Sequence, residues 1–363
     1  MAELYIGIMS GTSLDGVDAV LAAARGKKLR LVASVHLPYP ARLRRRLLAL
    51  QQIAHDELHR AALLSNELSD LYARAVRRLL ARAGVAARAV AAIGCHGQTV
   101  RHRPGDGYTL QLVNGARLAE RSGIAVVCDF RSRDIAAGGE GAPLVPAFHR
   151  ATFASTRSAR AIVNIGGIAN FTSLPVRGRV TGFDCGPGNV LMDAWIAEKR
   201  GKHYDARGAW AASGRVIPRL LRRLLVHPFF RRRPPKSAER GEFDLRWVRR
   251  ALSGRERPAD VQATLAELTA ASIARAVRMH ASSAREVYVC GGGARNRTLL
   301  SRLSALLPGK RVTTTAALGI APEHVEALAF AWLARQALKL RPGNLPAVTG
   351  ARGPRILGAI YPG

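Results

Sequence analysis

Short apolar runs alternate along the chain with longer stretches in which apolar residues recur at helical spacing. The short runs predict buried strands, and the longer stretches predict amphipathic helices. The first part of the chain gives three strands, two helices, and then a strand, a short helix and a strand, at 4–9, 17–24, 29–37, 41–54, 56–83, 89–95, 114–122 and 124–128. This order predicts a mixed sheet covered by helices.

A glycine-rich segment, AAGGEGAPLVP at 136–146, interrupts the pattern and has the composition of a linker. We therefore place a boundary near residue 135, between an N-terminal lobe of 1–135 and a C-terminal lobe of 136–363. The same plan then returns, with strands at 160–165, 169–174, 179–184, 286–290 and 310–315, and helices at 189–200, within 210–280, at 296–307 and at 322–339. The Pro- and Arg-rich stretch 227–260 is predicted to be a loop.

Length and composition favour two globular domains. The chain has 363 residues, more than one core usually holds, and its 48% apolar and 22% charged residues are ordinary for a globular protein. No apolar stretch approaches the ~18–20 residues that cross a bilayer. The start, MAELYIGIM, lacks the basic and long apolar regions of a signal peptide. We expect a cytoplasmic protein with no membrane partner.

The net charge is strongly positive, at +31, and 49 of the 56 basic residues are Arg because only 7 are Lys. Such a field attracts nucleic acid, anionic lipid or acidic small molecules. The Arg residues are spread over the whole chain, however, and the 6% of aromatic residues leave few platforms on which bases could stack. We expect solvated helix faces and no nucleic-acid partner, with a nucleic-acid binder kept as an alternative.

A turn between the first two predicted strands, SGTSLDG at 10–16, has the composition of a phosphate-binding hairpin. Its small residues let the backbone approach a ligand, Thr12 and Ser13 add hydroxyl donors, and Asp15 can hold Mg²⁺ through water. An ordinary β-hairpin with turn-forming Gly and Asp is the alternative. A Walker A sequence is absent, which excludes a P-loop NTPase.

Two further glycine clusters follow predicted strands. NIGGIAN at 164–170 opens the second lobe in a position that matches the first hairpin. CGGGARN at 290–296 follows a strand and precedes a helix, where backbone amides favour a phosphate or a nucleotide. Three clusters at strand ends are hard to explain by turn chemistry alone, so we expect a nucleotide site.

A single carboxylate, Asp184, stands at the end of a predicted strand in GFDCGPGN at 182–189. In that place it can project toward a γ-phosphate and accept a proton from a nucleophile. A helix N-cap is the alternative, but the helix predicted near Asn189 begins too far along the chain for Asp184 to cap it. We expect Asp184 to be a general base.

Polar residues also follow two predicted strands of the first lobe. CHGQTVRH at 95–102 and CDFRSRD at 128–134 offer His96, Gln98, Asp129 and Arg131. These side chains can bind hydroxyl, amide and carboxylate groups, and an Arg can clamp a carboxylate through two parallel bonds. We expect contacts to a polar substrate, with a structural network that ties the two halves together as the alternative.

These motifs, together with MSGTSLDGVD, AAGGEGAPLVPAFH, GFDCGPGNVLMDAW and VTGARGPRILGAIYP, resemble the anhydro-N-acetylmuramic acid kinase family. The likeness runs in order from about residue 5 to residue 361. It implies a two-lobed actin-like ATPase (ribonuclease H-like) fold, each lobe a mixed sheet flanked by helices, with a cleft between the lobes. It also implies a homodimer.

The family resemblance implies a kinase that uses ATP and Mg²⁺ to open 1,6-anhydro-N-acetylmuramic acid with water and to phosphorylate it to N-acetylmuramic acid 6-phosphate, in the recycling of cell-wall sugars. Asp184 matches the catalytic aspartate, and His96, Gln98, Asp129 and Arg131 fall where sugar contacts are expected. The residues expected at ATP are Gly11, Thr12, Ser13, Leu14, Asp15, Gly16, Val17, Asp18, Gly166, Gly167, Gly291, Gly292, Gly293 and Asn296. Another carbohydrate kinase of this fold, or an ATP-binding regulator without catalysis, are the alternatives.

The sequence departs from the family pattern in three places. The string PPKSAERGEFD differs from the expected PPKSTGRE type and leaves the role of Lys236 open. Cys185 stands where Thr is usual, next to the expected base, and Glu140 stands where Gln is usual. None of these changes removes the base or the phosphate hairpin.

Overall fold

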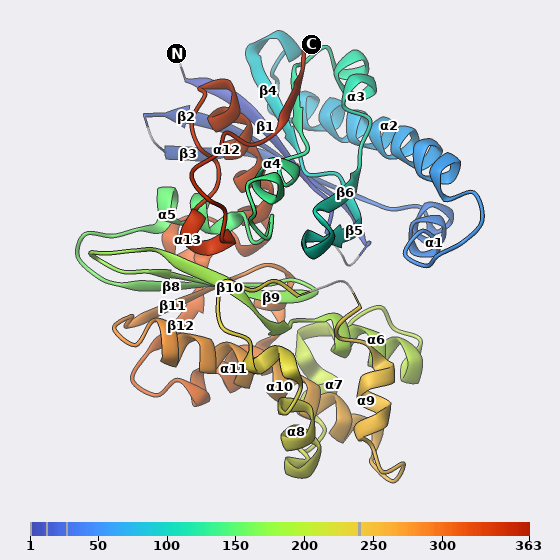
Figure 1. Ribbon diagram of the computed structural model, residues 1–363, viewed down its shortest axis with the longest axis vertical. Coiled ribbons are helices and arrows are strands. Elements are labelled where there is room, and N and C mark those ends of the chain that lie inside the picture. Colours follow the sequence, from blue (N-terminus) through green and yellow to red (C-terminus); the bar gives the residue numbers. More distant parts are fainter. Residues whose placement is uncertain (1, 12–13, 27, 239–240) are drawn as a thin grey trace. The chain divides into compact units, whose positions relative to one another are not determined.

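The chain forms two compact units in a computed structural model that describes residues 2–11, 14–26, 28–238 and 241–363 (Figure 1). The first unit combines Met1–Thr152 with His324–Gly363, and the second is Phe153–Glu323. Thr12 and Ser13 of the predicted phosphate hairpin lie outside the described residues.

A six-stranded mixed sheet in the order β13-β7-β4-β1-β2-β3 lies at the centre of the first unit. Its strands are β1 (Glu3–Met9), β2 (Gly16–Arg25), β3 (Lys28–Pro38), β4 (Val90–Cys95), β7 (Val126–Cys128) and β13 (Ala359–Tyr361). β1, β2 and β3 form an antiparallel meander, whereas β4 runs parallel to β1 and to β7. A separate hairpin, β5 (Gln98–Arg103) and β6 (Tyr108–Leu112), was not predicted.

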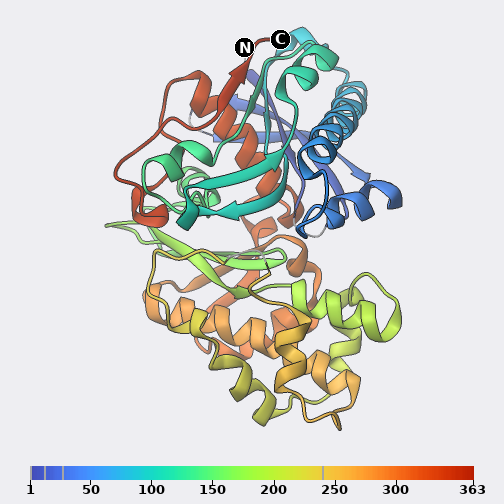
Figure 2. The same cartoon turned by 45° about the vertical axis from the view of Figure 1, so that its right-hand side comes forward.

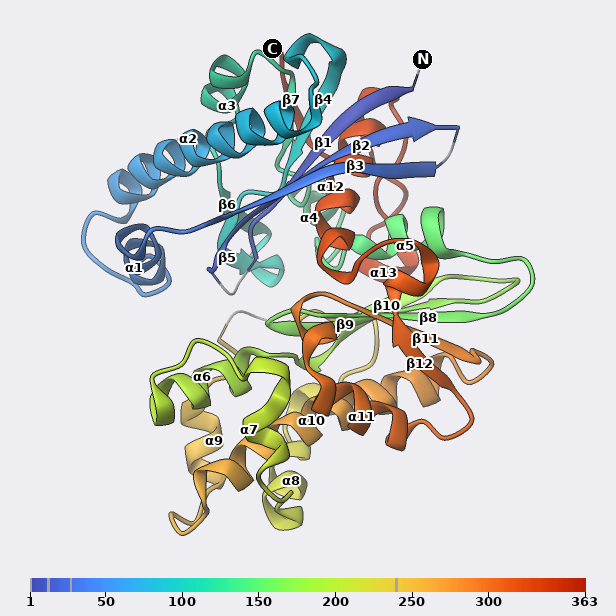
Figure 3. The same ribbon diagram turned by 180° about the vertical axis from the view of Figure 1, so that it is seen from behind.

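Helices cover both faces of this sheet (Figures 1 and 3). The helices of the first unit are α1 (Ala41–Ala49), α2 (Glu57–Ala83), α3 (Gly115–Ser122), α4 (Ser132–Ala136), α5 (Val145–Phe153, ending at the unit boundary), α12 (Val325–Leu338) and α13 (Pro346–Thr349). Short 3-10 turns lie at Ala87–Ala89 and Pro104–Asp106, and a third, Pro322–His324, spans the unit boundary. The long α2 carries an apolar stripe that joins Leu64, Leu68 and Tyr72 to the strand residues of one core. The α12 helix, from the far end of the sequence, packs on β1 and β4.

Two glycines let α12 lie directly on the strand backbones. A Cβ at Gly7 of β1 would lie 1.8 Å from the Ala327 carbonyl oxygen, and a Cβ at Gly94 of β4 would lie 2.0 Å from the Phe330 carbonyl oxygen. Both carbonyls belong to the rigid backbone of α12, so a side chain can be accommodated only if the helix moves. The close approach therefore fixes α12 to the first unit.

We expect Gly94→Ala to lower the free energy of unfolding by about 1–3 kcal/mol, the usual cost of overpacking a core. Gly105→Ala is the matched control, since a Cβ at Gly105 would meet no atom within 4 Å. Urea unfolding of both variants checks the prediction. Equal stability of the two variants would show that α12 can move to accommodate the added Cβ without lowering the free energy of unfolding.

A five-stranded mixed sheet in the order β10-β9-β8-β11-β12 forms the second unit. The strands are β8 (Arg160–Ile165), β9 (Ile168–Leu174), β10 (Thr181–Pro187), β11 (Glu286–Cys290) and β12 (Arg311–Thr314). β11 pairs in parallel with both β8 and β12, and β9 is antiparallel to β8 and to β10. Consequently β10, β8, β11 and β12 all point the same way, and their carboxyl ends share one edge.

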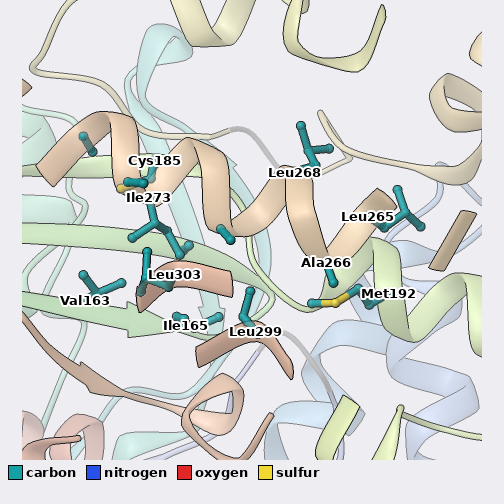
Figure 4. Packing of buried hydrophobic residues seen from close by; sticks show 14 of the residues in the cluster. Val163, Ile165, Cys185, Met192, Leu265, Ala266, Leu268, Ile273, Leu299 and Leu303 are labelled. Atoms are coloured by element: carbon teal, nitrogen blue, oxygen red, sulfur yellow. The ribbon is translucent and has the colours of Figure 1, made fainter. Parts of the chain in front are cut away.

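Helices gather on one face of this second sheet, as the orange helices below the strands show in Figure 2. They are α6 (Val190–Arg200), α7 (Ala209–Ala212), α8 (Pro218–Leu225), α9 (Leu245–Ala251), α10 (Pro258–His280) and α11 (Arg297–Leu306), with 3-10 turns at Ala206–Gly208, Pro228–Arg231, Gly292–Arg295 and Thr315–Leu318. Figure 4 shows Ile273 of α10 and Leu303 of α11 packed beside Val163 of β8. Burial of these apolar side chains holds the layer together.

The two units divide at different residues from the predicted boundary near 135. The segment 136–152 stays with the first unit, and the chain returns to it at His324. The glycine-rich segment that resembled a linker leads into helix α5, and the C-terminal strand β13 pairs with β7. The assignment of 136–363 to one lobe is therefore corrected to Phe153–Glu323.

Candidate active site

The turn after β1 is compact where the structure describes it. The Leu14 amide donates to the Gly11 carbonyl at 3.3 Å, and Leu14 takes a left-handed conformation with φ 54° while its side chain is buried. Asp15 is exposed, and its carbonyl accepts from the Tyr39 amide at 3.0 Å. The turn therefore presents the Asp15 side chain to solvent while Leu14 anchors it to the core.

A buried polar network supports this turn from below. The Ser10 hydroxyl lies 2.8 Å from the Tyr72 hydroxyl and donates to the Gly97 carbonyl at 3.0 Å. Gln98 is fully buried; its amide donates to the Gly11 carbonyl at 3.1 Å and accepts from the Tyr39 hydroxyl at 3.1 Å. Both the oxygen and the nitrogen of the Gln98 amide therefore have partners within the protein. This geometry favours a structural role for Gln98, holding the turn, rather than the predicted contact with the sugar.

Asp18, predicted at ATP, lies farther along β2. Its carboxylate contacts His36 Nδ1 at 2.8 Å. Burial raises the pKa of Asp18, while the neighbouring His36 opposes that shift. Among the described residues, no cluster of three or more His, Cys, Asp or Glu side chains is arranged to hold a metal ion. The single carboxylate of Asp15 stays the predicted metal contact.

His96 and Arg131, two of the predicted sugar-binding residues, are joined by hydrogen bonds. The Arg131 guanidinium donates to His96 Nε2 from Nη2 at 2.9 Å and to the Gly141 carbonyl from Nη1 at 2.7 Å. Burial and the charge of Arg131 lower the pKa of His96 to about 3. His96 is thus a neutral imidazole, and because Nε2 accepts, its proton is on Nδ1.

Asp129 and Asp134 flank Arg131 but differ in their surroundings. Asp129 is exposed in a left-handed conformation with φ 55°, and accepts from the Ser132 hydroxyl at 2.5 Å. Asp134 is fully buried; Oδ1 accepts from Asn344 at 2.7 Å and Thr349 at 2.8 Å, and Oδ2 accepts from the Gly141 amide at 2.9 Å. Sequence reasoning missed Asp134, which links the 136–146 segment to the C-terminal VTGARGP motif.

A row of polar residues crosses the sheet of the second unit. Asp184 of β10 pairs with Asn170 of β9, Asn170 pairs with Asn164 of β8, and Asn164 pairs with Cys290 of β11. Their chain neighbours Val163, Ile165, Phe171 and Phe183 belong to the hydrophobic core. Since side chains alternate along a strand, the polar row lies on the face opposite the core.

Asn170 was not predicted as a site residue. Its Oδ1 is buried and finds no hydrogen-bond partner among the described residues. The register places it directly beside Asp184, so an amide and a carboxylate share one face. The signal in the sequence was the final Asn of NIGGIAN, but its pairing with Asp184 depends on strand register that local pattern does not reveal.

The Asp184 carboxylate is about nine-tenths buried and is held by the backbone. The Ala238 amide donates to Oδ2 at 2.9 Å, and the Asp184 amide donates to the Lys236 carbonyl at 3.2 Å. Helix α6 begins only at Val190, so Asp184 does not cap it. Cys185 points the other way, into the core, and burial raises the pKa of its thiol. Cys185, which stands where Thr is usual in the family, therefore does not lie on the same face as the Asp184 carboxylate.

The glycine clusters of the second unit meet at the carboxyl ends of β8 and β11. The Gly166 and Gly167 carbonyls accept from the amides of Asn189 and Gly188, each at 2.8 Å. A Cβ at Gly291 would lie 2.4 Å from Asn164 Oδ1, so this glycine is needed for the strand end to approach β8. Gly292 is exposed beyond them. The glycines thus form one backbone platform.

Asn296, also predicted at ATP, has a local structural role. Its Oδ1 accepts from the Leu299 amide at 3.0 Å and caps the ten-residue helix α11. A side-chain oxygen used in this way satisfies one of the free amides of the first helical turn. The platform glycines are therefore better placed than Asn296 to approach a nucleotide.

Two mixed sheets with helices and glycine turns at strand ends are the features of the predicted two-lobed, actin-like fold. The solved structure of (R)-2-hydroxyglutaryl-CoA dehydratase component A from Acidaminococcus fermentans has the same fold, with a TM-score of 0.51, 14% identity, and coverage of 91% of this chain and 96% of that one. The predicted fold of two lobes, each a mixed sheet flanked by helices, is confirmed.

The sequence pattern of the anhydro-N-acetylmuramic acid kinase family matches residues 3–363. The anhydro-N-acetylmuramic acid kinase of Nitrosomonas europaea is 57% identical over 360 residues, and that of Nitrosospira multiformis is 58% identical over 363 residues, each match covering 99% of both chains. The chain belongs to the anhydro-N-acetylmuramic acid kinase family, as the motifs predicted. Among the described residues, no helix has the length and apolar content to cross a membrane.

Proposed function

We propose that this protein is an ATP-dependent kinase that hydrolyses the anhydro ring of 1,6-anhydro-N-acetylmuramic acid and transfers a phosphoryl group to O6, giving N-acetylmuramic acid 6-phosphate and ADP. The match to the family over residues 3–363 is the observation that carries this proposal. The role of the product lies in the recycling of cell-wall peptidoglycan.

Asp184 is the proposed general base. It takes a proton from a water whose oxygen attacks the anomeric carbon, while the bond from that carbon to the bridging O6 breaks. O6 then attacks the γ-phosphorus of ATP, the bond to the β-phosphate oxygen breaks, and ADP leaves. Two observations support this role. Asp184 lies on the polar face of its sheet, and the Ala238 amide holds its carboxylate in one orientation.

Phosphoryl transfer depends mainly on positioning and on neutralising charge. The glycine platform of Gly166, Gly167 and Gly291–Gly293 and the turn at Gly11–Asp18 are proposed to bind ATP in the same reaction, and the predicted cleft between the lobes stays a prediction. The exposed Asp15 carboxylate fits a Mg²⁺ held through water, since Mg²⁺ keeps several waters when proteins bind it. The ion would supply charge neutralisation on the phosphates.

Arg131, His96 and Asp129 are the proposed sugar contacts. The substrate carries a lactyl carboxylate, which an Arg side chain can bind through charge-assisted hydrogen bonds. Arg131 is suited to this contact because its side chain is only partly buried. Neutral His96 accepts from Arg131 and so fixes the plane of the guanidinium. Asp129 is exposed and free to accept from sugar hydroxyls with the oxygen that Ser132 leaves unused.

We expect Arg131→Ala mainly to raise the KM for the anhydro-sugar, by about tenfold or more, because a charge-assisted contact to the substrate is lost. Arg117→Ala is the matched control, since Arg117 makes a two-bond contact to Asp70 within the same unit. Steady-state kinetics with the sugar varied gives both values. An unchanged KM would assign Arg131 to the structural network alone.

We also propose that the protein acts in the cytoplasm as a homodimer. Light scattering of the purified protein tests the oligomeric state, and a monomer mass would end that part of the proposal.

Mass spectrometry in oxygen-18 water tests the function as a whole. Purified protein is incubated with anhydro-sugar, ATP and Mg²⁺. We expect a product with one added phosphate and one heavy oxygen on the anomeric carbon. Phosphorylation without heavy oxygen would indicate another carbohydrate kinase reaction, and ATP binding without product would indicate a regulator.

A further inference from the structure

β10 is an edge strand of its sheet, and a short segment, 234–238, lies along its open side at Asp184. The Asp184 amide, which would otherwise be unpaired at the edge, donates to the Lys236 carbonyl at 3.2 Å. Two residues later the Ala238 amide reaches the Asp184 carboxylate at 2.9 Å. The segment therefore holds both the backbone and the side chain of the proposed base.

Lys236 anchors this segment in the core. Its side chain is about nine-tenths buried, and Nζ donates to the Phe229 carbonyl at 3.1 Å. The same nitrogen lies 4.4 Å from the Phe229 ring centroid and 5.7 Å from that of Phe183, the residue before Asp184. Phe243 packs against Phe229 with ring centroids 5.2 Å apart. The ammonium is thus enclosed by aromatic rings on the core face of β10.

A buried ammonium is costly unless its surroundings favour the charge. Burial lowers the pKa of Lys236, and Arg275 and Arg232 lower it further, whereas Cys185 and Asp184 oppose that shift. Burial lowers the pKa of His280 of α10, and the charge of Lys236 lowers it further. Asp184 is therefore an acidic group of β10 whose charge favours the Lys236 ammonium.

We propose that Lys236 is a positioning residue for the reaction: it anchors the 234–238 segment so that the Ala238 amide holds the Asp184 carboxylate in place. This inference rests on the proposed function, in which Asp184 is the base. The side chain of Lys236 packs on the core face of β10 and its carbonyl binds the edge of the same strand at Asp184, so one residue links the aromatic core to the strand that carries the base. Misplacement of a catalytic group by about 1 Å can cost about 10²-fold in rate.

Lys236→Met tests the anchor, because Met fills much of the same space without the charge or the donor. We expect kcat to fall by about 10- to 100-fold, with KM for ATP and for sugar nearly unchanged, since neither ligand loses a contact. The acidic limb of the kcat profile should move to higher pH, because the ionised carboxylate loses a held donor and a nearby cation. Among the residues that the structure describes, the charged and titratable groups whose fields act on or receive that of Lys236 include Asp184, Cys185, Arg232, Arg275 and His280.

Lys310→Met is the matched control. Lys310 also uses its ammonium to bind backbone carbonyls, of Ser282 at 2.7 Å and Ala284 at 2.6 Å, but it lies immediately before β12. We expect this variant to lose stability without a change in kcat per folded molecule. Equal losses of kcat in the two Lys variants would overturn the positioning role.

Two more variants complete the test. Ala238→Pro removes the donor to Asp184 while leaving Lys236 in place, and is expected to lower kcat in the same way; it decides the matter if Lys236→Met fails to fold. Wild-type kcat in the variant that folds overturns the inference. Asp184→Asn, assayed beside them, separates the two proposals: substantial activity there refutes the base itself, whereas an inactive Asp184→Asn with a fully active Lys236→Met refutes only the anchor.

Discussion

Asp184→Asn is expected to lower kcat for sugar phosphorylation by about 10²- to 10⁴-fold, the range usual for loss of a general base. ATP binding should stay nearly intact, because the glycine platform binds through backbone groups that the substitution does not touch. The fold should also survive. An Asn side chain keeps an oxygen that can accept from the Ala238 amide as Oδ2 does now.

Calorimetric titration with ATP and a coupled assay for ADP check the two halves of this expectation. Residual ADP formation without sugar must be subtracted, because hydrolysis of ATP does not need the base. If turnover with sugar remains close to that of the unaltered protein, Asp184 is not the base. If ATP binding is lost as well, the substitution has disturbed the unit and the variant says nothing about catalysis, so thermal unfolding is measured alongside.

Asp134→Ala is expected to have the largest effect on stability. The substitution removes the acceptor shared by three donors, the Gly141 amide, the Asn344 amide and the Thr349 hydroxyl. The last two keep only longer contacts, to the Gly353 carbonyl at 3.3 Å and the Leu345 carbonyl at 3.5 Å. Each unsatisfied buried donor costs about 1–3 kcal/mol, and two of the three keep a long contact, so the free energy of unfolding should fall by about 3–5 kcal/mol, in the lower part of the summed range. The 136–146 segment and the C-terminal motif should both become exposed to hydrogen exchange.

Asp70→Ala is the control, because it also removes an Asp carboxylate, but one that is partly exposed rather than buried. Asp70 binds Arg117 at 2.9 Å with its side chain one-third exposed. Such surface ion pairs contribute about 0–1 kcal/mol. Urea unfolding compares the two variants. A loss for Asp134→Ala as small as that for Asp70→Ala would mean that water replaces the carboxylate at all three donors.

Local pattern was enough to predict most strands, because a buried strand is a continuous apolar run whose ends are marked by glycine or charge. It failed where polarity alternates. The β5–β6 hairpin, QTVRHR and YTLQL, carries polar residues on one face; the first strand was interpreted only as part of a substrate motif, and the second was not predicted. The stretch 227–260 was predicted as a loop, yet Phe229, Phe230 and Phe243 are buried in it and α9 forms within it.

The domain boundary failed for a topological reason. Helix α12 has no local mark that assigns it to the first sheet; only Gly7 and Gly94, some hundreds of residues away, make room for it. Strand β13 likewise finds its partner β7 far back in the chain. Long-range pairing of this kind is invisible to any window of sequence.

The sequence was enough to predict single residues of the candidate site, but not the contacts between segments that support them. Asp184 and the glycine turns follow apolar runs, so their place at strand ends could be foreseen. The contacts of Asn170 with its neighbour Asp184, of Gln98 with the first turn and of Asp134 with Gly141 depend on which strands and segments meet. Their amides and carboxylates are common in surface loops, and only the fold distinguishes them.

The return of 324–363 to the first unit bears on how the protein is made. A ribosome delivers the whole of Phe153–Glu323 before it delivers α12 or β13, so the unit encoded in the middle can mature first. The N-terminal strands must wait, with one side of their sheet uncovered, until the last segment emerges. We therefore expect chaperones that bind nascent chains to stay longest on the uncovered sheet of these N-terminal strands.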